Sequence, residues 1–259
     1  MFPNLLPTQT QIDLLSVLLH ESLADDRNKT NVHAHYHFPY HACLNEDATS
    51  PSKRSFFNAP RNSVEFFIPK DSAVHRPFSI SQFLSSRLRW MTLGSQYDWT
   101  AKQYPIDELQ SMPSAISKFF NALFPNVKPE AAIMNIYNPG DHLSMHRDVS
   151  EECDNPLVSV SLGCDGLFMV SLHVEGHSET AVLVLRLHSG DVLYLSGPAR
   201  FAWHGVPQVI GNTCPDWLRD WPAVEYCNEA DADRFREWRG WIANKRVNLS
   251  VRQVKSDAV

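Results

Sequence analysis

The sequence lacks the long apolar run that a membrane-spanning helix needs. Charged residues interrupt every hydrophobic stretch before it reaches the roughly 18 residues of a membrane span. The first residues, MFPNLLPTQTQ, have no basic residue before an apolar core and no Arg-rich amphipathic start, which argues against a secretory signal or a transit peptide. We expect an intracellular protein without membrane association, with nucleus, cytoplasm and mitochondrion left open.

Cysteine and positive charge are also scarce. The five cysteines form no CxxC pair and leave one over, which predicts reduced thiols. The chain has 23 Lys and Arg against 29 Asp and Glu, a net charge of −6, which argues against a uniformly basic nucleic-acid coat. A local basic groove stays compatible with this charge, because phosphate affinity depends on the local field.

The length and composition fit one globular domain. A chain of 259 residues can bury a substantial core and still form a single domain, and its 17 prolines predict many turns. We expect a monomer, with an N-terminal region over 1–125 and a core over 126–259.

The N-terminal region reads as two helices separated by a polar segment. Residues 8–23 have apolar side chains at helical spacing, and Thr8 and Gln11 are placed to form a capping box. The polar segment 25–62 is long for a structureless loop and predicts a functional lid or partial disorder. Residues 111–123 again show helical spacing.

Short β-rich segments dominate the rest of the chain, and turn signals such as PGD and GCDG separate most of them. A helix over 229–241 interrupts this series. Many short strands at this spacing predict a sandwich or jelly roll, so the fold class is α+β, a jelly roll with flanking helices. The predicted strands cover 131–137, 156–163, 167–174, 181–187, 191–196 and 246–254.

A histidine and an aspartate, His146 and Asp148, are two residues apart. In a strand such side chains point the same way and converge on one point. With His204 they make the two-histidine, one-carboxylate set of non-heme iron(II) oxygenases. The pattern alone is weak, because the chain has 12 histidines and a surface turn explains it better.

The segment 246–252 alternates polar and apolar residues, with Arg246, Asn248, Ser250 and Arg252 on one face of the expected strand. Two arginines and an amide on one face suit a dianion, because a guanidinium can bind a carboxylate through two parallel hydrogen bonds. A solvent-exposed polar face is the alternative.

Four segments together resemble the core of the AlkB family: NIYNPGDHLSMHRD, VSVSLG, HSGDVLYLSGPARFAWHGVP and RVNLSVRQV, in this order. The match covers roughly residues 131–254. Upstream, LRWMTLGSQYDW resembles the nucleotide-recognition region of the branch that contains AlkB homologue 1. The resemblance implies a double-stranded β-helix (jelly roll) with an N-terminal nucleotide-recognition extension, Fe(II), 2-oxoglutarate and O2, and oxidative demethylation of nucleic acid, tRNA or DNA.

The resemblance also assigns roles to single residues. His146, Asp148 and His204 match the iron ligands, and Arg246 matches the arginine that binds the distal carboxylate of 2-oxoglutarate. Four further residues match the rest of the cosubstrate pocket: Asn135, Tyr137, Asn248 and Arg252.

One position departs from the pattern of several repair members, which carry an acidic residue two positions after the HxD aspartate. This chain has Ser150 there, followed by Glu151 and Glu152. The branch of AlkB homologue 1 resembles HxDxSE at this point, so the departure favours that branch over alkylation repair.

Three other groups of residues are candidates for a site. The histidines His33, His35, His37 and His41 suit zinc, but an edge strand or lid explains their spacing better. A basic group interleaved with Phe56, Phe57, Phe66 and Phe67 fits a phosphate-and-base groove as well as a solvated face over buried rings: Lys53, Arg54, Arg61, Lys70 and Arg76. His142 and His146 have zinc-protease spacing, but the glutamate and the helix are missing.

Two alternative functions remain open at this point. The same chemistry can act on a protein side chain, or a silent jelly roll can bind a partner. The complete ligand set favours an enzyme over a silent module.

Overall fold

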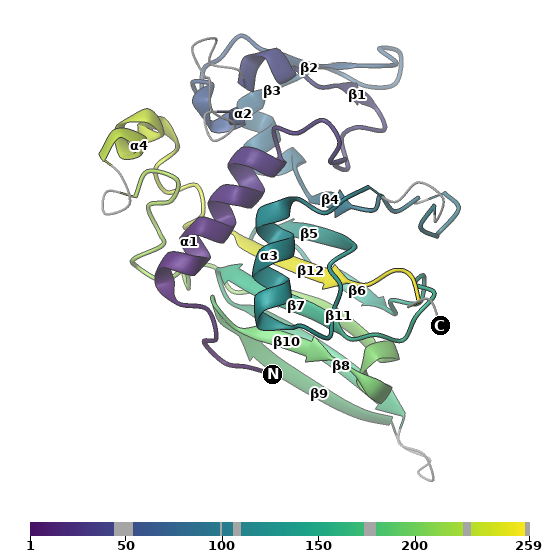
Figure 1. Cartoon of the computed structure of the whole chain (residues 1–259). Helices are drawn as coiled ribbons and strands as arrows, with labels where there is room; N and C mark the ends of the chain where they lie inside the picture. The colour runs from purple at the N-terminus through teal and green to yellow at the C-terminus, as the bar shows by residue number, and fades with distance from the viewer. Residues whose placement is uncertain (44–53, 99, 106–109, 174–179, 225–228, 257–259) are drawn as a thin grey trace.

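The computed structural model describes residues 1–43, 54–98, 100–105, 110–173, 180–224 and 229–256. Two antiparallel sheets face each other (Figure 1). The five-stranded sheet has the order β10-β7-β12-β5-β4, and the four-stranded sheet has the order β6-β11-β8-β9. The chain crosses repeatedly between the sheets, for instance from β5 to β6 and from β7 to β8, as in a jelly roll. This confirms the predicted fold class.

The predicted strands all form, with small shifts at their ends. Their β-branched and aromatic side chains suit a pleated, half-buried surface. The larger sheet comprises β4 (Trp90–Gly94), β5 (Ala131–Tyr137), β7 (Leu157–Gly163), β10 (Val192–Leu195) and β12 (Arg246–Arg252). The smaller sheet comprises β6 (Leu143–His146), β8 (Gly166–His173), β9 (Thr180–Leu187) and β11 (Trp203–Val209).

The central strands of the larger sheet place a group of polar side chains on its inner face. Strand β12 lies between β5 and β7, with Asn248 opposite Asn135 and Arg246 opposite Tyr137. Because directly opposite residues of an antiparallel pair point to the same face, these four polar side chains share the inner face of the sheet.

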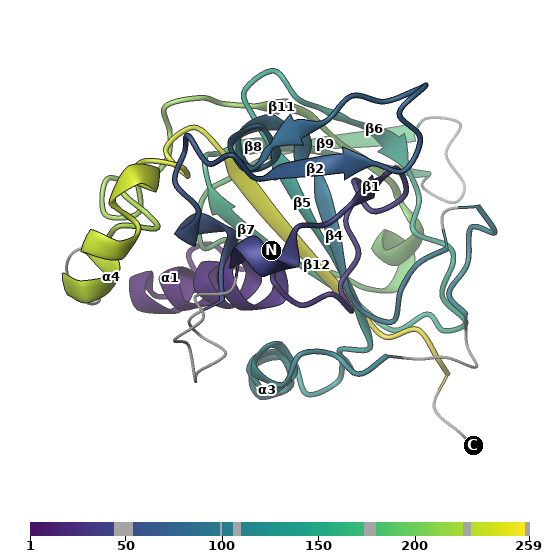
Figure 2. The ribbon, with the colours of Figure 1, turned by 90° about the horizontal axis from the view of Figure 1, so that it is seen from above.

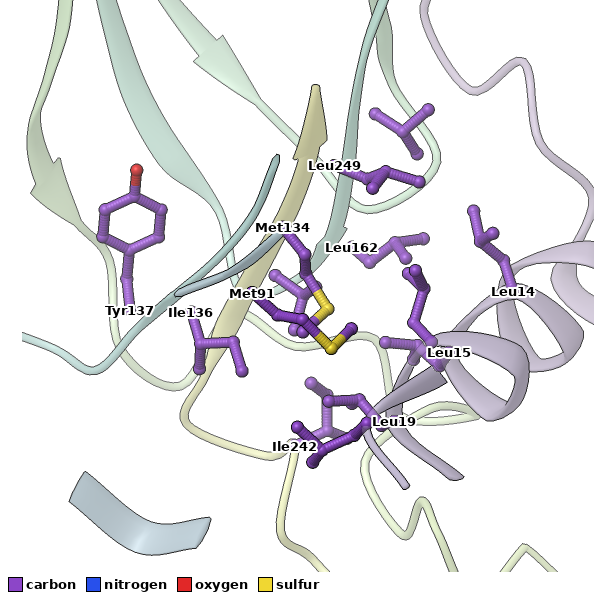
Figure 3. Close-up of a cluster of buried hydrophobic side chains, with 14 of the residues drawn as sticks. Leu14, Leu15, Leu19, Met91, Met134, Ile136, Tyr137, Leu162, Ile242 and Leu249 are labelled. Carbon is purple, nitrogen blue, oxygen red and sulfur yellow. The ribbon is translucent and has the colours of Figure 1, made fainter. Parts of the chain in front are cut away.

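The helices α1 (Thr8–Ser16) and α3 (Ser114–Leu123) cover the outer face of the larger sheet (Figures 1 and 2). From α1, Leu14 and Leu15 pack toward Met134 and Leu249 of the sheet, as Figure 3 shows. Burial of each such side chain contributes about 1.5–3 kcal/mol. This core fixes the sheet from behind, so its inner face is free for the site.

The predicted N-terminal helix forms, but its second half is a π-helix, η1 (Val17–Ser22). The capping box is wrong: Pro7 stands at the N-cap, and no side chain caps the helix. Gln11 is instead buried, where its Nε2 donates to the Leu6 carbonyl at 2.7 Å and its Oε1 accepts from Ser189 Oγ at 2.6 Å. A tertiary contact across 178 residues thus outweighs the local cap.

The predicted helix over 229–241 is shorter than expected, with α4 (Glu229–Arg234) followed by one 3-10 turn, η8 (Arg236–Trp238). The indole N–H groups of Trp238 and Trp241 donate to the carbonyls of Ala59 and Leu84, each at 2.9 Å. These tertiary contacts outweigh helix propensity here. The described chain contains no helix long and apolar enough to cross a membrane.

A small third sheet, β1-β2-β3, sits above the larger sheet in Figure 1. It comprises β1 (Tyr36–His37), β2 (Phe66–Pro69) and β3 (Phe78–Ser79), and it is followed by the short helix α2 (Ile80–Gln82) and the π-helix η5 (Phe83–Arg87). Part of the polar segment 25–62 therefore forms an edge strand. Short 3-10 turns also lie at η2 (Tyr40–Cys43), η4 (Phe56–Asn58) and η7 (Gly197–Phe201).

Candidate active site

Two histidines and one aspartate meet on the inner face of the smaller sheet. His146 ends β6 and stands directly opposite His204 of β11, with ring centroids 4.4 Å apart. Asp148 lies two residues beyond the strand, with Oδ1 3.8 Å from His146 Nε2 and Oδ2 3.9 Å from His204 Nε2. One ligand atom from each residue lies within 4.8 Å of the others, so the three can bind one metal ion.

Hydrogen bonds fix which ring nitrogen of each histidine faces the aspartate. The Nδ1 of His146 lies 2.9 Å from the Ser144 carbonyl, and that of His204 lies 3.0 Å from the Ala202 carbonyl. A carbonyl only accepts, so each Nδ1 carries the proton and each Nε2 keeps a lone pair. Burial lowers the pKa of His204 against the opposing attraction of Asp148, which favours the neutral imidazole that a metal requires.

The metal-ligating group opens into a cavity of about 340 Å³ between the two sheets. The opposite wall is the inner face of β5, β12 and β7. The polar residues of this wall are Asn135, Tyr137, Ser159, Arg246, Asn248, Ser250 and Arg252. Polar side chains on both walls and a largely apolar remainder are typical of a pocket that orients a small polar ligand.

At one end of the cavity, Arg246 is a buried guanidinium with most of its donors unused. It is 1% exposed, and among the described residues only Ser161 Oγ accepts from it, at 3.0 Å from Nη2. Its Nε and Nη1 have no partner, and neither does the nearby Tyr137 Oη. Burial lowers the pKa of Arg246 because no carboxylate lies beside it. A buried cation in this state suits an anionic ligand.

At the other end, Arg252 connects the cavity wall to the metal-ligating group. Its Nη1 donates to Glu151 Oε1 at 3.0 Å, and its Nη2 lies 3.4 Å from Asp148 Oδ2. Burial alone would raise the pKa of Asp148, but Arg252 and the two histidines outweigh it and hold this pKa below its ordinary value. Asp148 is therefore an anionic ligand at neutral pH.

The sequence matches the model of the 2OG-Fe(II) oxygenase superfamily over residues 40–252. The protein belongs to this superfamily. Within it the chain is an AlkB-like member of the ALKBH1 type. A Pyricularia oryzae protein named N6-methyladenosine RNA demethylase ALKB1 is 45% identical, over 98% of this chain and 73% of the relative.

Two further relatives and one solved structure agree with this placement. The tRNA demethylase abh1 of Schizosaccharomyces pombe is 35% identical over 97% of this chain and 77% of its own. The human nucleic acid dioxygenase ALKBH1 is 30% identical over 74% of this chain and 51% of its own. The solved structure of OsALKBH1 superposes with a TM-score of 0.54 at 19% identity, covering 97% of this chain and 95% of that one, which supports the fold.

The residues of the cavity fit the metal and cosubstrate of the superfamily. Two neutral imidazoles and one carboxylate on one side are the donor set that non-heme iron(II) prefers, with coordination positions left open. The Nε and Nη1 of Arg246 have no partner among the described residues, so this buried guanidinium keeps free N–H groups for a carboxylate of 2-oxoglutarate.

The structure brings all eight residues selected from the sequence to one cavity. One detail is wrong: His146 and Asp148 do not share a strand, because β6 ends at His146. Asn248 directs its amide nitrogen to Ser159 Oγ at 2.8 Å and to the Val160 carbonyl at 3.0 Å, so it also holds the sheet together. Ser150 lies at the cavity wall, with its Oγ 3.3 Å from Tyr97 Oη.

The structure does not support a zinc site at residues 33–41. His33 has both ring nitrogens engaged, one with Thr30 and the other with Tyr40 Oη, and burial lowers its pKa to about 3. Among the described residues, the one group of three metal-ligating side chains is the group at His146, so the zinc hypothesis at 33–41 is not supported.

The proposed basic groove is also not formed as expected. Lys53 lies outside the described residues. Arg61 donates to the Glu237 carbonyl at 2.5 Å and lies over the Trp238 ring, so its guanidinium is already engaged. Arg54 lines a different cavity that also contains acidic Asp25. The phenylalanines Phe56 and Phe57 are buried, which favours the alternative of a solvated face over buried rings.

Three residues of the site were missed in the sequence. Tyr104 lines the cavity with a buried, unpartnered hydroxyl, and its ring meets Tyr97 edge-on at 5.2 Å. Glu151 and Arg200 form a buried ion pair beside Asp148. A single tyrosine, glutamate or arginine gives no periodic signal. The nearness of Arg200 to His204 in GPARFAWHG was the one available hint.

Proposed function

We propose that this protein is an Fe(II)- and 2-oxoglutarate-dependent dioxygenase that demethylates methylated bases in nucleic acid. The observation that carries this proposal is the pairing, in one cavity, of a His–Asp–His group with a buried guanidinium that has no carboxylate partner among the described residues. The first group suits iron and the second suits the distal carboxylate of 2-oxoglutarate. The three relatives described above are named as RNA, tRNA or nucleic acid oxidising enzymes, which supports the substrate class.

The roles of the residues follow from their positions. His146, Asp148 and His204 hold iron through two Nε2 atoms and one carboxylate oxygen. Arg246 binds the far carboxylate of 2-oxoglutarate. When bound, iron with 2-oxoglutarate and O2 supplies hydroxylation of a methyl group, with succinate and CO2 as products, and a hydroxylated N-methyl group leaves as formaldehyde.

The remaining residues of the cavity bind and orient the cosubstrate. Tyr137 and Asn135 face the same space as Arg246 from β5, and the Tyr137 hydroxyl is free to donate. Arg252 keeps positive charge next to Asp148, where the carboxylate that chelates iron belongs. Arg246 and Arg252 are almost fully buried, and the low dielectric around them strengthens their interactions with an anion.

The wall near Ser150 faces the substrate. A serine has no carboxylate to pair with a cationic methylated base, so this position lacks the charge that such a base would favour. We infer that the enzyme prefers an unpaired or bulged base, because extraction from a regular duplex costs a few kcal/mol. Tyr97 and Tyr104 at the same wall offer aromatic surface on which a base can stack.

The decisive experiment is a substrate panel. Oligonucleotides that carry 1-methyladenine, 6-methyladenine or methylated cytosine, in RNA and in DNA, are incubated with iron, 2-oxoglutarate and ascorbate, and the products are measured by mass spectrometry. Loss of one methyl group with equimolar succinate supports the proposal. Succinate without any demethylated nucleic acid contradicts it and favours a protein side chain as the substrate. Neither product favours a silent binding module.

A further inference from the structure

The loop that carries Asp148 belongs to neither sheet, and its backbone is joined to the segment after β12 through Glu152, whose N–H donates to the Val254 carbonyl at 2.9 Å. Strand β6 ends at His146, and β7 begins at Leu157, so the loop 147–156 connects the two sheets. The two histidines sit on paired strands, whereas the aspartate depends on other contacts for its position.

Arg200 provides these contacts from a different part of the chain. It lies in the turn η7 that precedes β11, and it is 1% exposed. Its Nη1 donates to the Asp148 carbonyl at 2.9 Å, its Nε donates to the Asn155 carbonyl at 3.0 Å, and its Nη2 donates to Glu151 Oε2 at 2.8 Å. One guanidinium thus binds the beginning, the middle and the end of the loop, which its planar set of donors permits.

Glu151 continues the connection back to the aspartate. Its other oxygen, Oε1, accepts from Arg252 at 3.0 Å, and Arg252 Nη2 lies 3.4 Å from Asp148 Oδ2. The interactions close a ring that runs from the Asp148 carbonyl through Arg200, Glu151 and Arg252 to the Asp148 carboxylate. The ring holds two guanidinium groups and two carboxylates, so its charges balance.

We propose that Arg200 and Glu151 are positioning residues that hold Asp148 in the geometry required for metal binding. Arg200 fixes the backbone of Asp148, and Glu151 orients Arg252 so that it restrains one carboxylate oxygen, Oδ2. The other oxygen, Oδ1, then faces His146. This inference rests on the proposed function, in which Asp148 binds iron. Buried ion pairs contribute little net stability compared with apolar side chains, so a geometric role explains this ring better than a purely structural one.

The test uses cobalt(II) chloride as a metal probe and the variants Glu151→Gln and Arg200→Lys of the full chain. Glu151→Gln keeps the size of the side chain and removes its negative charge. Arg200→Lys keeps the positive charge and removes the three-way donation. Titration of the cobalt d–d absorption should show a Kd that is about 10- to 100-fold weaker than in the parent, as for other residues that orient metal ligands.

Two matched variants control for general destabilisation. Glu130→Gln changes another carboxylate that accepts two hydrogen bonds, from the backbone N–H groups of Val254 and Lys255. Arg89→Lys changes another arginine that binds one carboxylate through two hydrogen bonds, that of Asp141. Both controls should keep the cobalt Kd of the parent.

The outcomes separate this inference from the proposed function. The metal site itself is wrong if the parent shows no cobalt d–d absorption, or if that absorption persists in His146→Ala. If the parent binds cobalt and a folded ring variant binds it equally well, the positioning role is overturned. An equal loss in the controls overturns it as well. So does failure of both ring variants to fold by circular dichroism, because the ring is then a requirement of folding.

Discussion

Replacement of Arg246 by methionine should separate cosubstrate binding from stability. Arg246 is buried, donates one hydrogen bond to Ser161, and has no carboxylate partner among the described residues. Methionine keeps an unbranched apolar stem and removes the guanidinium and its charge. Because an isolated buried charge is unfavourable, the free energy of unfolding of the ligand-free protein should stay unchanged or rise by about 1 kcal/mol.

The effect on 2-oxoglutarate should be opposite and large. Loss of the partner of a buried carboxylate costs about 2–5 kcal/mol, and each 1.4 kcal/mol is about tenfold in affinity, so Kd should rise roughly 30-fold or more. At a concentration of 100 times the parental Kd, the ligand then stabilises the fold by about 0.9 kcal/mol instead of about 2.7 kcal/mol.

The assay is thermal unfolding with and without 2-oxoglutarate, with Mn(II) in place of iron to prevent turnover. Arg186→Met is the control, because Arg186 pairs with Asp165 and is half exposed. The reasoning is refuted if Arg246→Met melts well below the parent without ligand, or if 2-oxoglutarate stabilises it as strongly as the parent.

Further predictions address the metal ligands, the space beside Arg246 and the effect of pH on stability. Alanine at any one of the three proposed iron ligands should abolish turnover and weaken cobalt binding in a titration; full activity would remove that residue from the set. Gly166→Ala should raise the KM for 2-oxoglutarate about tenfold, because a Cβ there would lie 2.6 Å from Nε of the buried Arg246; an unchanged KM would show that the guanidinium can move freely. His20 is buried between Trp221 and Phe235, and burial lowers its pKa to about 3. Below about pH 6.5 the unfolded chain therefore binds a proton at His20, whereas the folded chain does not bind it until about pH 3. As the pH is lowered between these values, His20 decreases the free energy of unfolding by about 1.4 kcal/mol per pH unit. Urea titrations of His20→Phe from pH 7 to 4 should show that the free energy of unfolding depends less steeply on pH, by the equivalent of one proton. An unchanged pH dependence would contradict the burial argument.

Much of the fold follows from local patterns. The strands β5, β7, β8 and β12 are dense in β-branched and aromatic residues, and local sterics favour them as strands in any context. Alternation along β12 also predicted which side chains face the cavity, because the period of a strand is two. The strands β6 and β11 escaped prediction, since LSMH and WHGVPQV are short or contain glycine and proline.

The candidate site also has one part that the sequence predicts and one part that only the tertiary structure decides. The sequence by itself determined the residue types and the alternation, from which His146, Asp148, His204 and Arg246 could be selected. Only the tertiary structure decided how Asp148 is held, because its loop has no regular backbone pairing and depends on Arg200, 52 residues further along the chain. Ion pairs and hydrogen bonds between distant segments leave no periodic trace in a sequence. They exist only once the two sheets have brought their loops together.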